Sequence, residues 1–132
     1  MEFRENKAIY LQIADHVCEQ ILLGKWSNEG KVPSVRELAI SLEVNPNTVM
    51  RTYDVLQAKD IIQNKRGIGF FISENAVTNV KNYRKEQFIN DELPVVFRNI
   101  YFLNIGFDEI QQRYQQFVSE NFKNQETDHE NK

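Results

Sequence analysis

The chain has 132 residues, of which 41% are hydrophobic, and a formal net charge of −3 at pH 7. This size supports one small folded domain with an appendage, and no apolar run approaches the ~20 residues that a transmembrane helix needs. A single cysteine excludes an intrachain disulfide and a thiolate metal cluster, and the charged N-terminus lacks the apolar stretch of a signal peptide. We therefore expect a cytoplasmic protein without a metal or cofactor.

The first predicted helix covers residues 8–23. Gly24 follows it as a candidate for the residue after the C-cap, and Trp26 is expected to close the end of the core. Apolar side chains recur along this segment at helical spacing and form one stripe. They are Tyr10, Ile13, Ala14, Val17 and Ile21.

A second helix is expected to begin after Ser34 and to end near Leu42. Ser34 stands three residues before Glu37, which is the S-x-x-E pattern of a capping box. Ser34 can accept the backbone N–H of Glu37 while the Glu37 carboxylate reaches back to Ser34. Leu38 and Ala39 supply part of its apolar face.

A third helix is expected from Pro46 to about Lys59. Asn45 is a favoured N-cap residue, and proline is well suited to the first helical position. The connection Glu43-Val44 is too short for anything but a tight helix-turn-helix, although it lacks the glycine that often occupies such a turn.

Two short β-prone runs, 61–63 and 70–72, follow the third helix. The residues between them include Gly67 and Gly69, which can adopt positive φ, so a β-hairpin is predicted. Three helices followed by a two-stranded hairpin with a basic tip form the winged-helix arrangement. We assign residues 1–73 to such a domain.

Residues 74–123 are predicted to be mostly helical. Pro94 interrupts this pattern, so a kink or a restart is expected near Asp91, a possible N-cap. Asp108 is expected to cap a last helix together with Gln111. Residues 124–132 contain no apolar side chain and are predicted to be disordered.

This C-terminal segment carries more large apolar residues than two helices can bury between themselves. We predict that they form a homodimer interface, the alternative being that they pack against the winged-helix domain. The predicted dimerisation residues are Phe97, Ile100, Tyr101, Leu103, Phe107, Ile110, Tyr114 and Phe117.

The third helix is predicted to have a core face and an opposite polar face. With ~100° per residue, Asn47, Thr48 and Arg51 point away from the core. Arginine can bond a guanine edge, asparagine an adenine, and threonine a phosphate or a thymine methyl. The N-terminal part of a recognition helix is also the part that enters the major groove. An ordinary solvated face is the alternative.

Basic residues occur at two further positions that suit DNA. Arg36 lies in the first turn of the second helix, where the helix dipole disfavours a cation unless an anion such as a phosphate is bound nearby. Lys65 and Arg66, beside Gly67, form a hairpin tip that can reach the backbone or the minor groove. A surface salt bridge of Arg36 and a merely exposed charged turn are the alternatives.

The string VPSVRELAISLEVNPNTVMRTYDVL, followed by IIQNKRGIGFFI, closely resembles the DNA-binding domain of the GntR family. The NPNTVxRxY and RGxGxF portions are most similar to its YtrA-type subfamily. The resemblance implies a dimeric bacterial repressor that binds an inverted-repeat operator, with a short two-helix dimerisation segment after the wing. Members of that type often control transporter operons. Some relatives have an arginine where this chain has Pro46 or Met50, so base readout is expected to differ.

The resemblance implies DNA contacts at positions that match Arg36, Asn45, Asn47, Thr48, Arg51, Arg66 and Gly67. Together with Ser34 and Lys65, these residues form our predicted site for double-stranded DNA. The expected function is sequence-specific transcription regulation from a palindromic operator; any small-molecule effector stays unidentified.

Two other classes of function were weighed. An enzyme is disfavoured because His16 and Cys18, the only plausible base and nucleophile, point in different directions from one helix. A winged-helix module that binds protein instead of DNA is the serious alternative, because the chain is acidic.

Overall fold

The computed structural model describes residues 1–3, 6–26 and 30–130, with side chains as far as residue 122. It forms two compact units, Met1–Gln87 and a second that begins at Phe88. The first contains α1 (Ile9–Leu22), α2 (Val35–Leu42), α3 (Pro46–Ala58), β1 (Ile62–Lys65), β2 (Gly69–Ile72) and α4 (Ala76–Gln87). The second contains the π-helical segment η1 (Phe88–Glu92), α5 (Leu93–Phe102) and α6 (Phe107–Glu130). The predicted mainly helical fold with a small antiparallel hairpin is confirmed.

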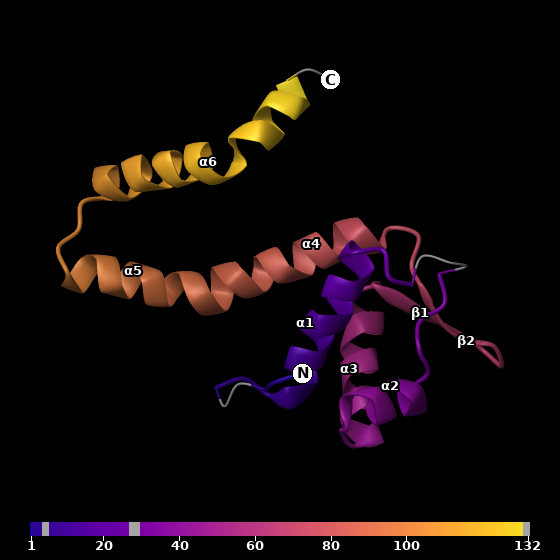
Figure 1. The fold of residues 1–132 in the computed structure, drawn as a ribbon. Helices are drawn as coiled ribbons and strands as arrows, with labels where there is room; N and C mark the ends of the chain where they lie inside the picture. The colour runs from indigo at the N-terminus through magenta and orange to yellow at the C-terminus, as the bar shows by residue number, and fades with distance from the viewer. Residues whose placement is uncertain (4–5, 27–29, 131–132) are drawn as a thin grey trace. The chain divides into compact units, whose positions relative to one another are not determined.

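The core of the first unit lies where α1, α3 and the start of the hairpin meet. Helices α1 and α3 run side by side, α2 packs against α3, and the hairpin turn projects beyond the helices (Figure 1). Trp26 packs against the core cluster, as predicted. The largest fully buried apolar side chains are Ile13, Val17, Cys18, Val49, Tyr53, Leu56, Ile61, Ile62 and Val80.

Helix α1 ends as its sequence predicts but begins without a side-chain cap. Gly24 has φ of +72°, and its N–H donates to the Ile21 carbonyl at 3.1 Å. At the other end, the buried Gln12 side chain donates to the Lys7 carbonyl at 2.7 Å. The Gln12 side chain, within α1, thus stabilises the backbone that precedes the helix.

The connection between α2 and α3 explains how a tight turn forms without glycine. Glu43 takes the left-handed conformation, with φ of 57° and ψ of 47°, directly after α2. A residue with a Cβ pays about 1–2 kcal/mol for this conformation. The Val44 N–H donates to the Ala39 carbonyl at 3.0 Å, and Val44 packs against the core, so tertiary contacts hold the turn.

Each strand of the hairpin is one residue longer than predicted, and the first begins at Ile62 instead of Ile61. Ile62 pairs with Ile72 and Lys65 with Gly69, so the turn consists of Arg66, Gly67 and Ile68. A third stretch of backbone joins the other edge of β2: the Val32 N–H donates to Phe70 at 3.0 Å, and the Ile72 N–H donates to Gly30 at 2.6 Å. The wing is therefore supported on both sides of β2.

The first compact unit extends beyond the boundary at Ser73 that the sequence predicts. Ala76, Val80 and Tyr83 of α4 are buried, and α4 packs against α1. Their burial places α4 with the winged helix because the core of that unit is not closed without them.

The second unit departs from the prediction at both expected helix starts. Asp91 lies inside η1, and Glu92 precedes α5 without a side-chain cap, so the predicted Asp91 cap was wrong. The chain passes through a π-helical segment, and Pro94 occupies the first turn of α5, where a missing N–H is tolerated. Asp108 lies within the first turn of α6 and is not its cap, because the Gly106 carbonyl accepts the first helical N–H groups.

Helix α6 continues to Glu130, through most of the segment 124–132 for which the sequence predicts disorder. Gln125, Glu126 and Glu130 have good helix propensity, which favours continuation of the helix through part of this segment. Asn131 and Lys132 lie outside the described residues. Within the described part, no helix combines the length and the apolar character needed to cross a bilayer.

Candidate nucleic-acid interface

The two faces of α3 separate as predicted. Val49, Tyr53 and Leu56 are fully buried. Asn47 and Arg51 are exposed, and Thr48 is half-buried. The amide and guanidinium side chains on the outer face are thus available to a partner, whereas the inner face is committed to the core.

The Arg51 side chain is not extended freely into solvent. Its guanidinium carbon lies 4.1 Å from the centroid of the Tyr10 ring, in the first turn of α1. Arg51 takes part in no ion pair among the residues that the structure describes. Its N–H groups are therefore not consumed by a neighbouring carboxylate.

The N-terminus of α2 presents Ser34 and Arg36 together. Both residues are exposed. The Ser34 hydroxyl oxygen accepts the Glu37 N–H at 3.1 Å, which leaves its own hydrogen free to donate to an acceptor such as a phosphate. The Ser34 N–H donates to the Glu37 carboxylate at 3.2 Å, so the predicted capping box is confirmed.

The start of α2 carries charged side chains of both signs, Arg36 and Glu37. Hydrogen bonding to Ser34, first through its side chain and then through its backbone, lowers the pKa of the Glu37 carboxyl. Arg36 forms no ion pair in the described part of the chain, so the alternative that it is held in a surface salt bridge is not seen. Arg36 thus lies without an ion-pair partner in the described part of the chain, at a helix N-terminus whose dipole disfavours a cation.

Asn45 has both a structural role and an unused donor. Its side-chain oxygen accepts the Asn47 N–H at 2.8 Å, which caps α3 as predicted. Because the oxygen is engaged, the side-chain NH₂ of this exposed residue is the group that can donate to a partner.

The wing tip is exposed and basic. Lys65, Arg66 and Gly67 are all exposed, and Gly67 has φ of +79°, a conformation that favours glycine. The Lys65 ammonium lies 4.3 Å from the centroid of the Phe71 ring on the paired strand. The Lys65 side chain thus lies against β2. Arg66 is the basic residue of the turn itself.

Sequence reasoning missed one cation of the wing, Lys31. Lys31 forms a bridge with Phe71 on the free edge of β2, and its side chain passes Gly69, with its Cε 3.3 Å from where a Cβ on Gly69 would lie. The only local signal is Val32 before Pro33, a pair that favours extended backbone. Its pairing with β2 is a long-range contact that no local pattern reveals.

Tyr53 connects the three parts of the candidate interface. Its hydroxyl donates to the Pro33 carbonyl at 2.6 Å, directly before the start of α2. Its ring packs edge to face against Phe70 of β2, with centroids 4.9 Å apart. A single buried side chain of α3 thus fixes both the α2 N-terminus and the wing.

The described residues offer little for catalysis. No cluster of His, Cys, Asp and Glu suitable for a metal is present among them. Burial raises the pKa of the Cys18 thiol to about 12, so it is not a thiolate near neutral pH. His16 lines an open groove of about 390 Å³ with Trp26, Glu37 and other residues, but Cys18 is not part of it.

Comparison with known proteins agrees with this arrangement. The model for bacterial regulatory proteins of the gntR family matches residues 9–72. The HTH-type transcriptional repressor YtrA of Bacillus subtilis (strain 168) is 35% identical over 107 residues, which cover 81% of this chain and 82% of that protein. The chain belongs to the GntR family.

One further relative and one solved structure are also similar to this chain. The HTH-type transcriptional regulator YhcF of Bacillus subtilis (strain 168) is 44% identical over 75 residues, which cover 57% of this chain and 62% of that protein. A crystal structure described as a GntR-family transcriptional regulator from Bacteroides thetaiotaomicron is 49% identical. Its TM-score is 0.73, and the match covers 86% of this chain and 98% of that one.

Family membership settles the class of function. This chain is a GntR-family transcription regulator with a DNA-binding helix-turn-helix, and it is not an enzyme. The predicted family and fold are confirmed. The roles of individual residues at the interface stay predictions.

Proposed function

We propose that this GntR-family protein is a dimeric repressor that inserts α3 into the major groove of an inverted-repeat operator. The observation that carries the proposal is the outer face of α3, where Asn47 and Arg51 are exposed. Neither residue forms an ion pair in the described part of the chain. Amide and guanidinium groups that are not held by a carboxylate are suited to base edges in the major groove.

The surrounding cations supply contacts to the DNA backbone. Arg36 and Ser34 lie at the N-terminus of α2. Their side chains can bind a phosphate there, and the positive end of the helix dipole favours the same anion. Arg66 and Lys65 of the wing, together with Lys31, extend the positive surface along the hairpin. Asn45 and Thr48 donate near the start of α3, and Gly67 lets the tip approach the DNA closely.

An acidic chain can bind DNA when its basic groups share one face. The whole chain has a formal net charge of −3, whereas the charged residues within 31–36 and 65–66 are all basic. Affinity depends on the charge of the face that approaches the phosphates, because exposed charges beyond ~10 Å are largely screened at 0.1 M salt.

The second unit supports the dimer. Large apolar side chains of α5 and α6 are strongly exposed, including Tyr101 at 76% and Phe107 at 68%. A second copy would cover such a surface, and a twofold dimer presents two α3 helices to two half-sites. The proposed dimerisation residues are Phe97, Ile100, Tyr101, Leu103, Phe107, Ile110, Tyr114 and Phe117.

Repression is the outcome that the similarity favours. The Bacillus subtilis relative that matches over 82% of its length is named a transcriptional repressor. A compact dimer bound across a promoter would repress by occupying the DNA.

The test is binding to promoter fragments from the neighbourhood of the protein's own gene, measured by electrophoretic mobility shift. We expect a retarded complex that maps to an inverted repeat. The logarithm of the affinity should fall with the logarithm of salt concentration with a slope of about −0.9 per neutralised phosphate. If no fragment is retarded at low salt, the alternative of a protein-binding winged helix replaces this proposal.

A matched pair of substitutions separates the interface from bulk charge. Arg36→Ala should weaken binding to all operator variants and reduce the salt slope by about one unit. Lys81→Ala removes an exposed cation from α4 and should leave the slope unchanged. Equal effects of the two substitutions would mean that general charge, and not the α2 N-terminus, drives binding.

The dimer is tested by sedimentation velocity at micromolar concentration. We expect twice the mass of the 15.6 kDa chain, and a shift toward the monomer in Tyr101→Glu. Asp108→Asn, an exposed polar change in α6, serves as the control. A monomeric wild-type chain would contradict the interface assignment.

A further inference from the structure

Tyr10 is the residue outside the helix-turn-helix that contacts an outer-face side chain of α3. Its ring lies under the Arg51 guanidinium, with 4.1 Å between the guanidinium carbon and the ring centroid. Tyr10 belongs to the first turn of α1 and is half-buried, whereas Arg51 is exposed. The contact therefore joins two helices at the edge of the core.

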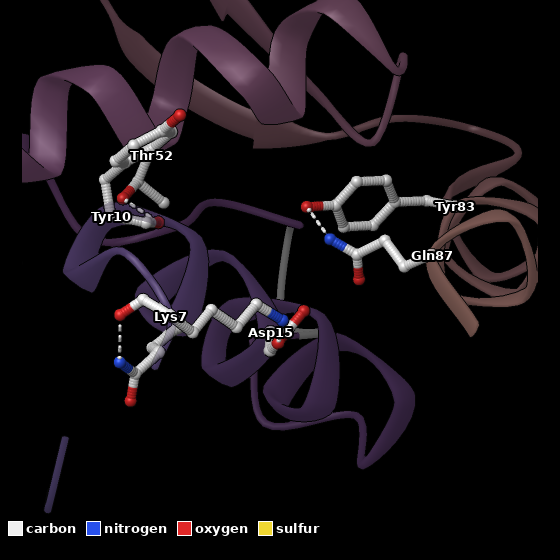
Figure 2. A network of polar contacts seen from close by, with 7 residues as sticks. Lys7, Tyr10, Asp15, Thr52, Tyr83 and Gln87 are labelled. Atoms are coloured by element: carbon white, nitrogen blue, oxygen red, sulfur yellow. Dashed lines mark hydrogen bonds and ion pairs between the residues drawn. The ribbon is translucent and has the colours of Figure 1, made fainter. Parts of the chain in front are cut away.

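The backbone that carries Tyr10 is fixed to α3 one residue away from Arg51. The hydroxyl of Thr52 lies 2.7 Å from the Tyr10 carbonyl oxygen and 3.2 Å from that of Thr48. Thr52 is fully buried, so this hydrogen bond is shielded from water. Figure 2 shows the Thr52 hydroxyl against the Tyr10 backbone, at the place where α1 begins beside α3.

Further contacts hold the start of α1 in place. Lys7 forms an ion pair with Asp15, and Gln12 donates to the Lys7 carbonyl at 2.7 Å. Figure 2 shows Lys7 and Asp15 below Tyr10. The ring and the guanidinium thus come from two backbone segments that buried and half-buried polar contacts hold together.

An aromatic partner makes a different demand on the arginine donors from a carboxylate. A guanidinium that lies over an aromatic ring uses its flat face, whereas its N–H groups lie at the edge of the plane. A carboxylate partner would instead occupy those N–H groups. Arginine also has many rotamers in solution, and a ring on one side reduces the number that it samples before binding.

We propose that Tyr10 is a positioning residue for DNA recognition, which holds the Arg51 guanidinium in one orientation with its donors free for a base edge. The inference rests on the proposed function, in which Arg51 reaches into the major groove. It extends the recognition surface to α1, which itself need not touch the DNA.

Three Tyr10 variants test this inference. Tyr10→Phe keeps the ring and should bind as the wild type does. Tyr10→Leu and Tyr10→Gln lack a ring, and each should lose about two- to fivefold in affinity, the range expected of an exposed cation–π contact. The bond from Thr52 reaches the Tyr10 backbone, so it is retained in all three variants. Thermal unfolding identifies any variant that does not fold. If one of the two variants without a ring fails to fold, the other still tests the inference.

The binding measurement uses a fluorescein-labelled duplex with the inverted repeat recovered in the mobility-shift experiment, and its single-base variants. Tyr10→Leu should flatten the base preference at the same position that Arg51→Ala flattens. In the Arg51→Ala background, Tyr10→Leu should have no further effect. A loss that persists in that background would overturn the inference, because Tyr10 would then act independently of Arg51.

A measurement without DNA makes the two failures distinguishable. In the free protein, the ring should shift the Arg51 side-chain proton resonances upfield, and Tyr10→Phe should preserve this shift while Tyr10→Leu abolishes it. Equal Arg51 resonances in Tyr10→Leu and wild type would overturn the positioning contact. A normal ring shift together with unchanged DNA affinity in Arg51→Ala would instead overturn the role of Arg51 in the proposed function, and the inference with it.

Discussion

Tyr53 shows how one side chain coordinates several surface groups. It is fully buried, yet its hydroxyl bonds the Pro33 carbonyl before α2 and its ring packs against Phe70 of the wing. Because α2, α3 and the wing meet at this residue, its loss should affect the spacing of cations that lie well away from it.

We predict that Tyr53→Phe lowers the free energy of unfolding by about 1 kcal/mol, the usual net value of one hydrogen bond. The ring contact with Phe70 is retained, so the loss reports the hydroxyl alone. Urea unfolding measures it. Tyr114→Phe, in an exposed tyrosine of α6, is the control and should leave stability unchanged.

Cys18 is predicted to be chemically silent in the folded protein. Burial raises the pKa of its thiol from 9.0 to about 12. Between these values the unfolded chain releases this proton and the folded chain retains it, so the free energy of unfolding should fall as pH rises above about 9. The wild type should lose stability more steeply there than Cys18→Ala. At neutral pH, a thiol reagent should label Cys18 only after urea is added; rapid labelling of the native protein would contradict its burial.

At the residue scale, the sequence predicts which face of α3 is buried because helical periodicity alone sorts Val49 and Tyr53 from Asn47 and Arg51. It does not predict Tyr10 beneath Arg51 or Lys31 beside Gly69. Both contacts join residues far apart in the chain, and each depends on how separate segments pack. Helical periodicity places Tyr10 only on the apolar stripe of its own helix.

At the scale of elements, the helix starts in the first unit follow local chemistry closely. Ser34 with Glu37 and Asn45 with Pro46 satisfy the backbone groups that the first turn leaves unpaired. Each of these patterns spans no more than four consecutive residues, so the sequence alone predicts it. The π-helical segment η1 is not predicted, because no capping pattern of this kind marks residues 88–92.

The capping box of α2 should give the protein an acid-dependent component of stability. Hydrogen bonding to Ser34 lowers the pKa of Glu37 in the folded state, so this stabilisation is present above the unfolded value of ~4.3 and is lost as pH falls through the lower folded value. Glutamine can form the same bond without titrating.

We therefore expect wild type to lose stability relative to Glu37→Gln when thermal unfolding is followed by circular dichroism from pH 5 downward. Glu74→Gln, at an exposed glutamate after the wing, is the matched control and should show a smaller change. Parallel curves for wild type and Glu37→Gln would show that the carboxylate is not engaged in solution.

At the scale of the whole molecule, the buried apolar residues of the described part all lie between Ile13 and Tyr83. The first unit therefore holds its own core, and α4 is part of it. Composition predicted the change in character after Ser73 but not where the core ends, since Ala76, Val80 and Tyr83 could equally have belonged to a separate helical segment.

Two fragments test this division. Residues 1–87 should unfold cooperatively as a monomer, because the core is complete. Residues 1–73 lack three buried side chains of α4 and should be less stable by on the order of 3–5 kcal/mol. Thermal unfolding and sedimentation compare them. Similar stability of both fragments would mean that α4 contributes little to the core.

The division of α3 into two faces also bears on how such a regulator could change its target over generations. The side chains proposed to read bases, Asn47 and Arg51, share no position with those that hold the fold, Val49 and Leu56. A mutation at the outer positions can therefore alter operator preference while folding remains intact. Gene duplication could yield regulators with separate targets through a few substitutions on the outer face of α3. The residue at position 51 would still have to pack against Tyr10.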